Sequence, residues 1–470
     1  MSRIRRVLCC ALVAVGLLGV TAGPALAHAT LLGATPGVNG RGVSEGQQSV
    51  ALRFSEPVQI LNPSDVSVVN ERNRRIDTGA AHTVKGNPEE IIIPLRGPLL
   101  PYSYTVRYRV VSSDSHAVSA AFVFGVGKAK LGDPILAGSG GLSDTSPPAV
   151  AARAVELTAL GLLVGLIVFR LLVWGPAVEG AGGLSLADRA SAMRNGRKTF
   201  WRAFWALTIL AGLAETAVLA AKSAVVFHTG VIGTLAHPTD AYRLVAASRF
   251  GDLLGWRCGA LLVVVAIGFV VWNAETAEEP VVSERRWSLA LMGVFGLAAL
   301  TMLADQGHAS QAPLAPLSVA ADAVHLAGAA IWIGGLPCLL AVLLRAPRVL
   351  PEGGRTLASA TLKRFSKVAL WSVVVISVTG LARMTGELSS PAQLWETGYG
   401  RDLMLKASLL LPILLIARRN RRFVAALAGG LTPSAARLRS VARSLQMELA
   451  IGAGIIVVAA LLVAQIPGRA

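Results

Sequence analysis

Three residues in the first quarter of the chain have the types and the spacing of a metal site. Asp114 and His116 are two residues apart in a segment with strand character, so their side chains would face the same way. His28 follows Ala25-Leu26-Ala27, a small-residue pattern typical of signal-peptide cleavage, and cleavage there would make it the first residue. Such a histidine can bind a metal through both its α-amine and its imidazole. These nitrogen and oxygen donors together favour tetragonal Cu(II), whereas structural zinc usually has thiolates or more imidazoles.

The cleavage prediction depends on the first 27 residues, which have the composition of a secretory signal peptide. Arg3, Arg5 and Arg6 form its positive region, and an apolar stretch follows from residue 7 to residue 20. We therefore expect residues 1–27 to be removed and the following segment to be exported.

Residues 28–127 are expected to form a small all-β domain. Short alternating stretches, such as 50–54 and 104–110, recur between turn-rich clusters. About a hundred residues with this spacing favour a sandwich or a barrel. Residues 128–148 are rich in Gly and Pro and have the composition of a linker.

Residues 149–470 are expected to form an all-α polytopic membrane domain. The chain is 53% hydrophobic and only 15% charged, which is too apolar for an ordinary water-soluble protein. Its apolar runs of about 18 to 25 residues match the length that crosses a hydrocarbon core about 30 Å thick. We predict about eight transmembrane helices, near 150–173, 201–222, 255–272, 287–304, 318–344, 368–386, 402–417 and 447–465.

The net charge of +17 is explained by membrane topology, and no nucleic-acid partner is expected. If the first domain is exported, the connections that fall on the inner side carry most of the arginine and lysine, as the positive-inside rule requires. The sequence thus predicts a multi-pass protein of the bacterial cytoplasmic membrane with its N-terminal domain on the extracytoplasmic side. The basic residues concerned include Arg189, Arg194, Arg197, Lys198, Arg345, Arg348, Arg355, Arg418, Arg419, Arg421 and Arg422.

Three residues of the membrane domain are candidates for a copper path: His308, Asp322 and His325. His325 falls within a predicted span, where an ionisable side chain is costly and therefore a functional candidate. Asp322 is three residues earlier on the same helical face, and it could orient the imidazole or share an ion with it. The alternative is a hydrogen bond that only packs helices together. His308 lies just beyond a span and could pass copper toward His325, although a solvated loop histidine is an open alternative.

Other polar residues in apolar surroundings are expected to pair inside the helix bundle, but the sequence does not assign the partners. They are Glu156, Glu215, Arg383, Lys406 and Glu448.

Two sets of motifs resemble known families. His28-Ala29-Thr30-Leu31, Phe54-Ser55-Glu56-Pro57-Val58 and Ser113-Asp114-Ser115-His116 are similar to the CopC family of exported copper-binding proteins. This resemblance implies a Greek-key barrel or sandwich with a Cu(II) site formed by His28, Asp114 and His116. Gly307-His308-Ala309, the segment 325–336, Arg364-Phe365-Ser366 and Tyr399-Gly400 are similar to the CopD family, which implies a membrane component of copper transport or resistance.

The leading hypothesis is a copper transporter and not an enzyme. Cu(II) would be captured by the exported domain, passed to the membrane domain and carried inward, with the direction implied by the resemblance alone. No nucleotide-binding loop is present in the sequence, which disfavours ATP-driven export. The alternative is a membrane-anchored copper chaperone or buffer that confers resistance or supplies a cuproenzyme without transport. The expected partners are the copper ion and the bilayer, with envelope cuproenzymes or copper chaperones as further possibilities. The copper oxidation state in the membrane domain, Cu(I) or Cu(II), is left open.

Overall fold

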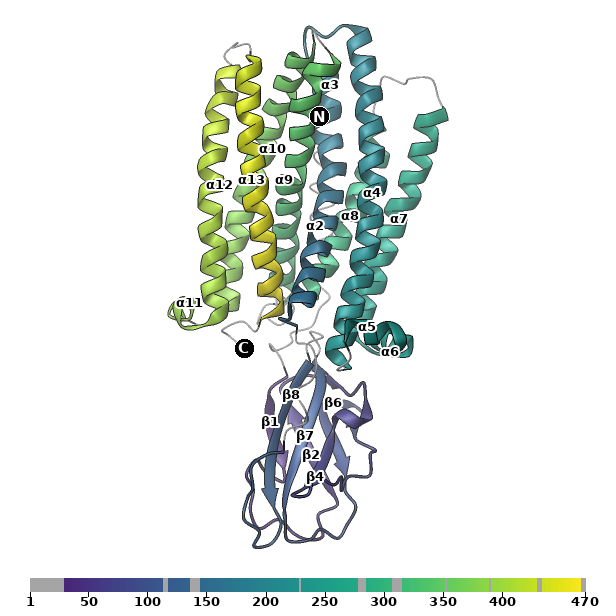
Figure 1. Ribbon diagram of the computed structural model, residues 1–470, viewed down its shortest axis with the longest axis vertical. Coiled ribbons are helices and arrows are strands. Elements are labelled where there is room, and N and C mark those ends of the chain that lie inside the picture. The colour runs from purple at the N-terminus through teal and green to yellow at the C-terminus, as the bar shows by residue number, and fades with distance from the viewer. Residues whose placement is uncertain are drawn as a thin grey trace.

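A computed structural model describes most of the chain after the proposed signal peptide. The described residues are 29–112, 117–135, 144–227, 230–277, 285–306, 315–350, 353–388, 390–428 and 433–465. A strand-rich domain is followed by a long bundle of helices, and the two are joined end to end (Figure 1).

The first domain consists of two antiparallel sheets packed face to face. One sheet has the order β1-β2-β6-β5, and in the other β7 pairs with β3, β4 and β8. This arrangement confirms the all-β prediction. The strands are β1 (Leu31–Thr35), β2 (Ser49–Phe54), β3 (Val58–Gln59), β4 (Ser67–Asn70), β5 (His82–Val84), β6 (Asn87–Pro94), β7 (Ser103–Ser112) and β8 (Ala117–Gly125).

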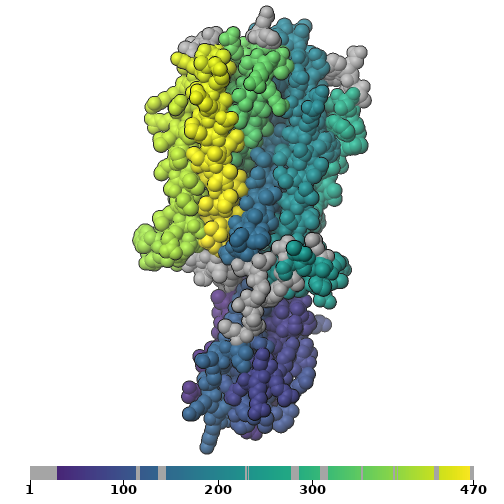
Figure 2. Space-filling model, in the orientation of Figure 1, coloured from purple at the N-terminus to yellow at the C-terminus, as the bar shows by residue number. Residues whose placement is uncertain are grey.

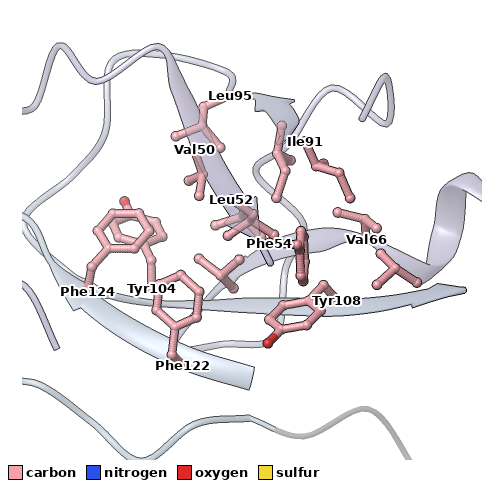
Figure 3. Close-up of a cluster of buried hydrophobic side chains, with 14 of the residues drawn as sticks. Val50, Leu52, Phe54, Val66, Ile91, Leu95, Tyr104, Tyr108, Phe122 and Phe124 are labelled. Carbon is pink, nitrogen blue, oxygen red and sulfur yellow. The ribbon is translucent and has the colours of Figure 1, made fainter. Parts of the chain in front are cut away.

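The core of this domain follows from the period-two pattern of its strands. In β2, Val50, Leu52 and Phe54 alternate with more exposed residues and point between the sheets (Figure 3). Phe54 meets Tyr108 of β7 edge to face, with ring centroids 5.4 Å apart. Burial of this apolar layer stabilises the domain, and no disulfide contributes among the described residues.

The second domain is an all-α bundle, as predicted. Among the described residues, eight helices contain 20 or more residues and run side by side along the long axis (Figure 1). They are α2 (Pro147–Phe169), α4 (Leu186–Val226), α7 (Arg249–Ala277), α8 (Arg286–Asp305), α9 (Ala315–Val349), α10 (Gly354–Glu387), α12 (Gly398–Ala428) and α13 (Ala435–Ala464). Shorter elements are the π-helical turn η3 (Arg170–Trp174), α3 (Gly175–Gly180), α5 (Val231–Ala236), α6 (Pro238–Ala247) and α11 (Gln393–Glu396).

Seven of the predicted spans meet the requirements of length and composition for crossing a membrane, so the chain is a multi-pass membrane protein. The expected eighth span, 402–417, is not among these seven helices in the described part of the chain. It lies in α12, where Asp402, Lys406 and Arg418 leave no apolar window of sufficient length. Helix α12 is 31 residues long, but polar residues occur along its length.

Helices α2 and α9 approach each other closely through glycine. A Cβ atom on Gly165 would lie 2.5 Å from the backbone of Ala330 and Gly334, which no side chain could tolerate. Contacts of this small-residue type replace the hydrophobic effect as the source of helix association in a bilayer.

The β domain is seated on one end of the bundle, called here the β-domain end (Figures 1 and 2). Val111 of β7 is buried in a cluster formed mainly by helix residues, and Leu61 packs at its edge. The Arg109 guanidinium donates a hydrogen bond to the carbonyl oxygen of Val225, the penultimate residue of α4. The helix residues of this cluster are Ala152, Val218, Ala221, Val226, Leu244, Phe250 and Leu254.

The opposite end of the bundle, called here the far end, carries the predicted basic connections. Helix α4 begins there, with Arg189, Arg194, Arg197 and Lys198 in its first turns (Figure 1). Helix α9 ends there, with Arg345 and Arg348 close to its last residue.

Candidate functional site

The expected ligands of the exported copper site lie outside the described residues. This is the case for His28, Asp114 and His116, and also for His308 of the membrane path. Within the described ranges, no group of three or more His, Cys, Asp or Glu side chains is arranged to hold a metal.

Ala29, directly after His28, is firmly held. Its side chain is buried in the core of the β domain. The next residue, Thr30, donates its backbone N–H to Ser55 Oγ at 3.0 Å, and Ser55 donates its own N–H to the Thr30 carbonyl at 2.9 Å. This double link attaches the beginning of the described chain to the end of β2.

The segment 113–116 connects two strands that are paired up to its edges. Val111 of β7 pairs with Ala117 of β8, and Ser112 pairs with Val58 of β3. Val58 follows Ser55 by three residues, a path of at most about 11 Å. The residues that flank the expected ligands thus come together at one end of the sandwich. Because Val111 contacts the helices, this is the end that faces the bundle.

Glu56, the acidic residue of the Phe54-Ser55-Glu56-Pro57-Val58 motif, is buried in the fold. It lies between the end of β2 and the start of β3, next to Ser55, and its residue is only 1% exposed. A buried carboxylate is costly unless hydrogen-bond donors or a positive charge compensate it. In the sequence, the signal for this buried position is an acidic residue between a strand and a proline.

Asp65 and Arg109 set the charge at the junction between the domains. Burial raises the pKa of Asp65 to about 6, although the positive charge of Arg109 opposes the shift. The same arginine bonds across to α4. A second link is the 2.9 Å ion pair between Lys222 of α4 and Asp144, which precedes α2.

His325, in the part of α9 nearer the β-domain end, is 9% exposed and has a defined partner on α10. Its Nδ1 atom lies 3.1 Å from Thr379 Oγ1. The Thr379 hydroxyl lies 2.7 Å from the carbonyl oxygen of Val375 in its own helix. A hydroxyl has one proton, and a carbonyl oxygen can only accept, so this proton goes to Val375.

The tautomer of a neutral imidazole follows from that hydrogen bond. The Thr379 oxygen must accept, so the neutral ring carries its proton on Nδ1 and keeps the lone pair of Nε2. Imidazole nitrogen in this form binds metals, and a fixed partner on the opposite nitrogen is the usual way of orienting such a ligand.

Asp322 is buried near His325 but has a different partner. Its carboxylate pairs with Arg383 of α10 at 2.7 Å, and Arg383 pairs with Glu387 at 2.7 Å. Glu387 in turn accepts a hydrogen bond from the Tyr399 hydroxyl of α12 at 2.6 Å. Thr379, rather than Asp322, orients the imidazole, and sequence reasoning missed it because it is 54 residues away.

Two family models match the chain. The CopC domain matches residues 31–127, and Copper resistance protein D matches residues 359–462. The Copper transport protein CutJ of Bacillus subtilis (strain 168) is 27% identical over 448 residues, which is 92% of this chain and 73% of CutJ. Protein YobA of Escherichia coli (strain K12) is 33% identical over 100 residues, which is 21% of this chain and 79% of YobA.

Two solved structures are also similar to the N-terminal part. CopC from Methylosinus trichosporium OB3b is 25% identical and covers 23% of this chain and 99% of its own, with a TM-score of 0.19. PcoC, a methionine-rich copper resistance protein from Escherichia coli, is 23% identical and covers 21% of this chain and 99% of its own, with a TM-score of 0.18. The chain therefore combines a CopC domain and a copper resistance protein D domain in one polypeptide.

Proposed function

We propose that this protein handles copper at the cell envelope: its β domain captures Cu(II) through His28, Asp114 and His116, and its helix bundle carries copper across the membrane. The β domain is on the extracytoplasmic side, and transport is inward. The protein is a transporter, and copper is its cargo.

The observation that carries the proposal is the seating of the β domain. The residues that flank the proposed ligands, Ala29, Ser112 and Ala117, gather at one end of the sandwich, and Val111 at that end is buried against α2, α4 and α7. An exported domain that only stored copper would have no need to bury this end against the bundle. This arrangement supports a short transfer from the capture site to the membrane domain.

His325 supports a receiving site inside the bundle. Its Nε2 lone pair is kept available by the Nδ1 contact with Thr379. The ion pairs of Asp322, Arg383 and Glu387 sit beside it and hold α9 and α10 together. Buried ionisable groups within spans mark substrate and ion pathways in membrane proteins.

The direction of the bundle in the membrane is supported by charge. The far end has the arginines and lysines of α4 and α9, and basic segments stay on the cytoplasmic side. This orientation leaves the β-domain end outside, where His28 would be the first residue after cleavage. The similarity to CutJ, a copper transport protein, extends over both domains.

Copper accumulation in cells that express single variants tests the proposal. We expect His116→Ala and His325→Ala each to lower cytoplasmic copper at unchanged protein level. His82→Ala is the matched control, because His82 is an exposed histidine of the same β domain whose Nδ1 contacts its own Ala80 carbonyl at 2.9 Å. Normal accumulation in the His325→Ala cells would contradict the membrane site. Loss of copper resistance or of a cuproenzyme with no change in cytoplasmic copper would instead support the chaperone or buffer function.

A further inference from the structure

A second buried polar cluster lies in the first half of the bundle, on helices that carry neither Asp322 nor His325. Its centre is Arg257 of α7, a fully buried arginine. Arg257 binds Glu215 of α4 through two nitrogens, with Nε–Oε1 at 2.8 Å and Nη2–Oε2 at 2.6 Å. The same Nη2 atom lies 2.9 Å from Oε1 of Glu156 on α2. Two carboxylates from different helices therefore meet at one nitrogen.

Arg153 completes the charge balance from the edge of the cluster. Its Nη1 atom lies 2.6 Å from Glu156 Oε2, and its side chain retains 18% of its exposure. Gln306, the residue directly after α8, accepts from Arg257 Nη1 at 3.0 Å. With Arg153 in place, two arginines balance two carboxylates, while Cys258 is the further titratable side chain close to the group.

A cavity connects this cluster to the β-domain end of the bundle. Its volume is about 50 Å³, enough for about three water molecules, and both Arg153 and Gln306 line it. The ion pair of Asp144 and Lys222 lies at its rim. Glu156 is nine residues into α2, about 14 Å along the helix from its first residue. Arg153 is thus the link between the cavity and a pair of carboxylates that are otherwise enclosed by protein.

A purely structural role would not require this arrangement. One arginine and one glutamate suffice to join two helices, and apolar side chains of similar volume would often join them as well. Here a second carboxylate is added next to the first, and its counter-ion Arg153 is the charged member of the cluster that lines the cavity. If Arg153 turns into the cavity, a single cation remains for two adjacent buried carboxylates, and like charges at this distance favour protonation of one of them.

We propose that Glu156 and Glu215 form a proton-binding site that couples copper movement to the proton gradient, with Arg153 as the movable counter-ion. When Arg153 leaves, one carboxylate oxygen takes a proton from water in the cavity and becomes a neutral acid. When Arg153 returns during copper transfer, the acid releases that proton toward the opposite side of the membrane, so that the proton and the copper cross together. The coupling of protons to copper rests on the proposed function, because it requires that the protein moves copper. Proton binding by Glu156 and Glu215 does not depend on that function.

The test uses purified full-length protein in liposomes, with internal dyes that report copper and pH. For the wild type, we expect Cu(II) entry to change several-fold with an imposed pH gradient and to be accompanied by a change in internal pH. Glu215→Gln keeps the shape and most hydrogen bonds but cannot ionise, so entry should continue without a pH gradient and should no longer respond to one. Glu275→Gln is the matched control, because Glu275 is a buried carboxylate paired with Arg170 at 2.5 Å outside this cluster.

The outcomes separate this proposal from the proposed function. Wild-type copper entry that ignores the gradient, or a Glu215→Gln variant that follows it as the wild type does, overturns proton coupling and leaves copper transport intact. If the wild type moves no copper, the proposed function fails, and the site is then judged by infrared difference spectra recorded across neutral pH. The signal of a protonated carboxylic acid should disappear in Glu215→Gln and persist in Glu275→Gln. Its absence from the wild type refutes proton binding by this pair.

Discussion

Replacing Thr379 by valine should impair copper transport by releasing the orientation of His325. Valine has nearly the same shape as threonine but offers no acceptor to the imidazole Nδ1–H, which now lies 3.1 Å from Thr379 Oγ1. The helix itself loses little, because the Thr379 hydroxyl only adds a second bond to the Val375 carbonyl. The change therefore acts mainly on the ring.

The size of the effect follows from the burial of the ring. A buried donor left without its partner costs about 1–3 kcal/mol. The imidazole avoids this cost if its proton moves to Nε2 or if the ring rotates. In either case the Nε2 lone pair is no longer presented to copper. A penalty of this size corresponds to a factor of about 5 to 150 in the population of the metal-binding form. Lost orienting partners of metal ligands have effects of about 10-fold to 100-fold, in the same range.

The assay is the initial rate of copper entry into liposomes that contain the full-length protein. We expect Thr379→Val to lower this rate about tenfold, and Thr379→Ser, which keeps the hydroxyl, to stay close to the wild type. Equal rates for the valine and serine variants would refute the tautomer argument. A loss in both variants would assign Thr379 to helix packing instead.

Three further predictions concern the β domain and the bundle. Glu56→Gln replaces a buried carboxyl group next to Ser55 and should weaken Cu(II) binding about tenfold in a competition titration with a chelator, whereas unchanged affinity would separate Glu56 from the site. Asp65 has its pKa raised from 3.8 to about 6 by burial, against the charge of Arg109, so its contribution to stability is present at acidic pH and lost as pH rises through 6. Asp65→Asn should therefore raise the melting temperature at neutral pH and flatten its dependence on pH between 4 and 6, and a variant that is less stable at neutral pH would contradict this sign. Gly165→Ala should reduce the yield of folded protein in size-exclusion chromatography, because the added Cβ would lie 2.5 Å from the α9 backbone. Gly161→Ala is the control and should give a normal yield, because its Cβ meets nothing within 4 Å.

The sequence by itself predicted the two-part architecture, because the patterns involved are local. Alternation of Val50, Leu52 and Phe54 requires only that one face of a strand be buried, and the apolar runs require only that a helix match the bilayer. The sequence predicted eight spans, whereas seven helices among the described residues are long and apolar enough to cross a membrane. Lys406 interrupts a run that is otherwise long enough, and the sequence does not show what its helix packs against.

The candidate copper ligands of the exported domain stay a prediction from sequence, since His28, Asp114 and His116 lie outside the described residues. The fold adds that Thr30 is hydrogen-bonded to Ser55 and that Ser112 pairs with Val58. Two chain segments more than 80 residues apart are thereby brought to one end of the sandwich. Strand pairing decides this proximity, and strand alternation alone does not.

Only the tertiary structure decided the partners of the charged residues inside the bundle. Glu156 and Glu215 were expected to pair somewhere, and both meet Arg257, which the sequence did not single out. Asp322 and His325, on one face of α9, turn to different partners on α10. The physical reason is that hydropathy and helical period specify which face of a helix is buried, whereas the partner depends on the rotation and height at which two helices pack. Those are determined by close contacts such as Gly165 against α9, which bring distant parts of the chain together.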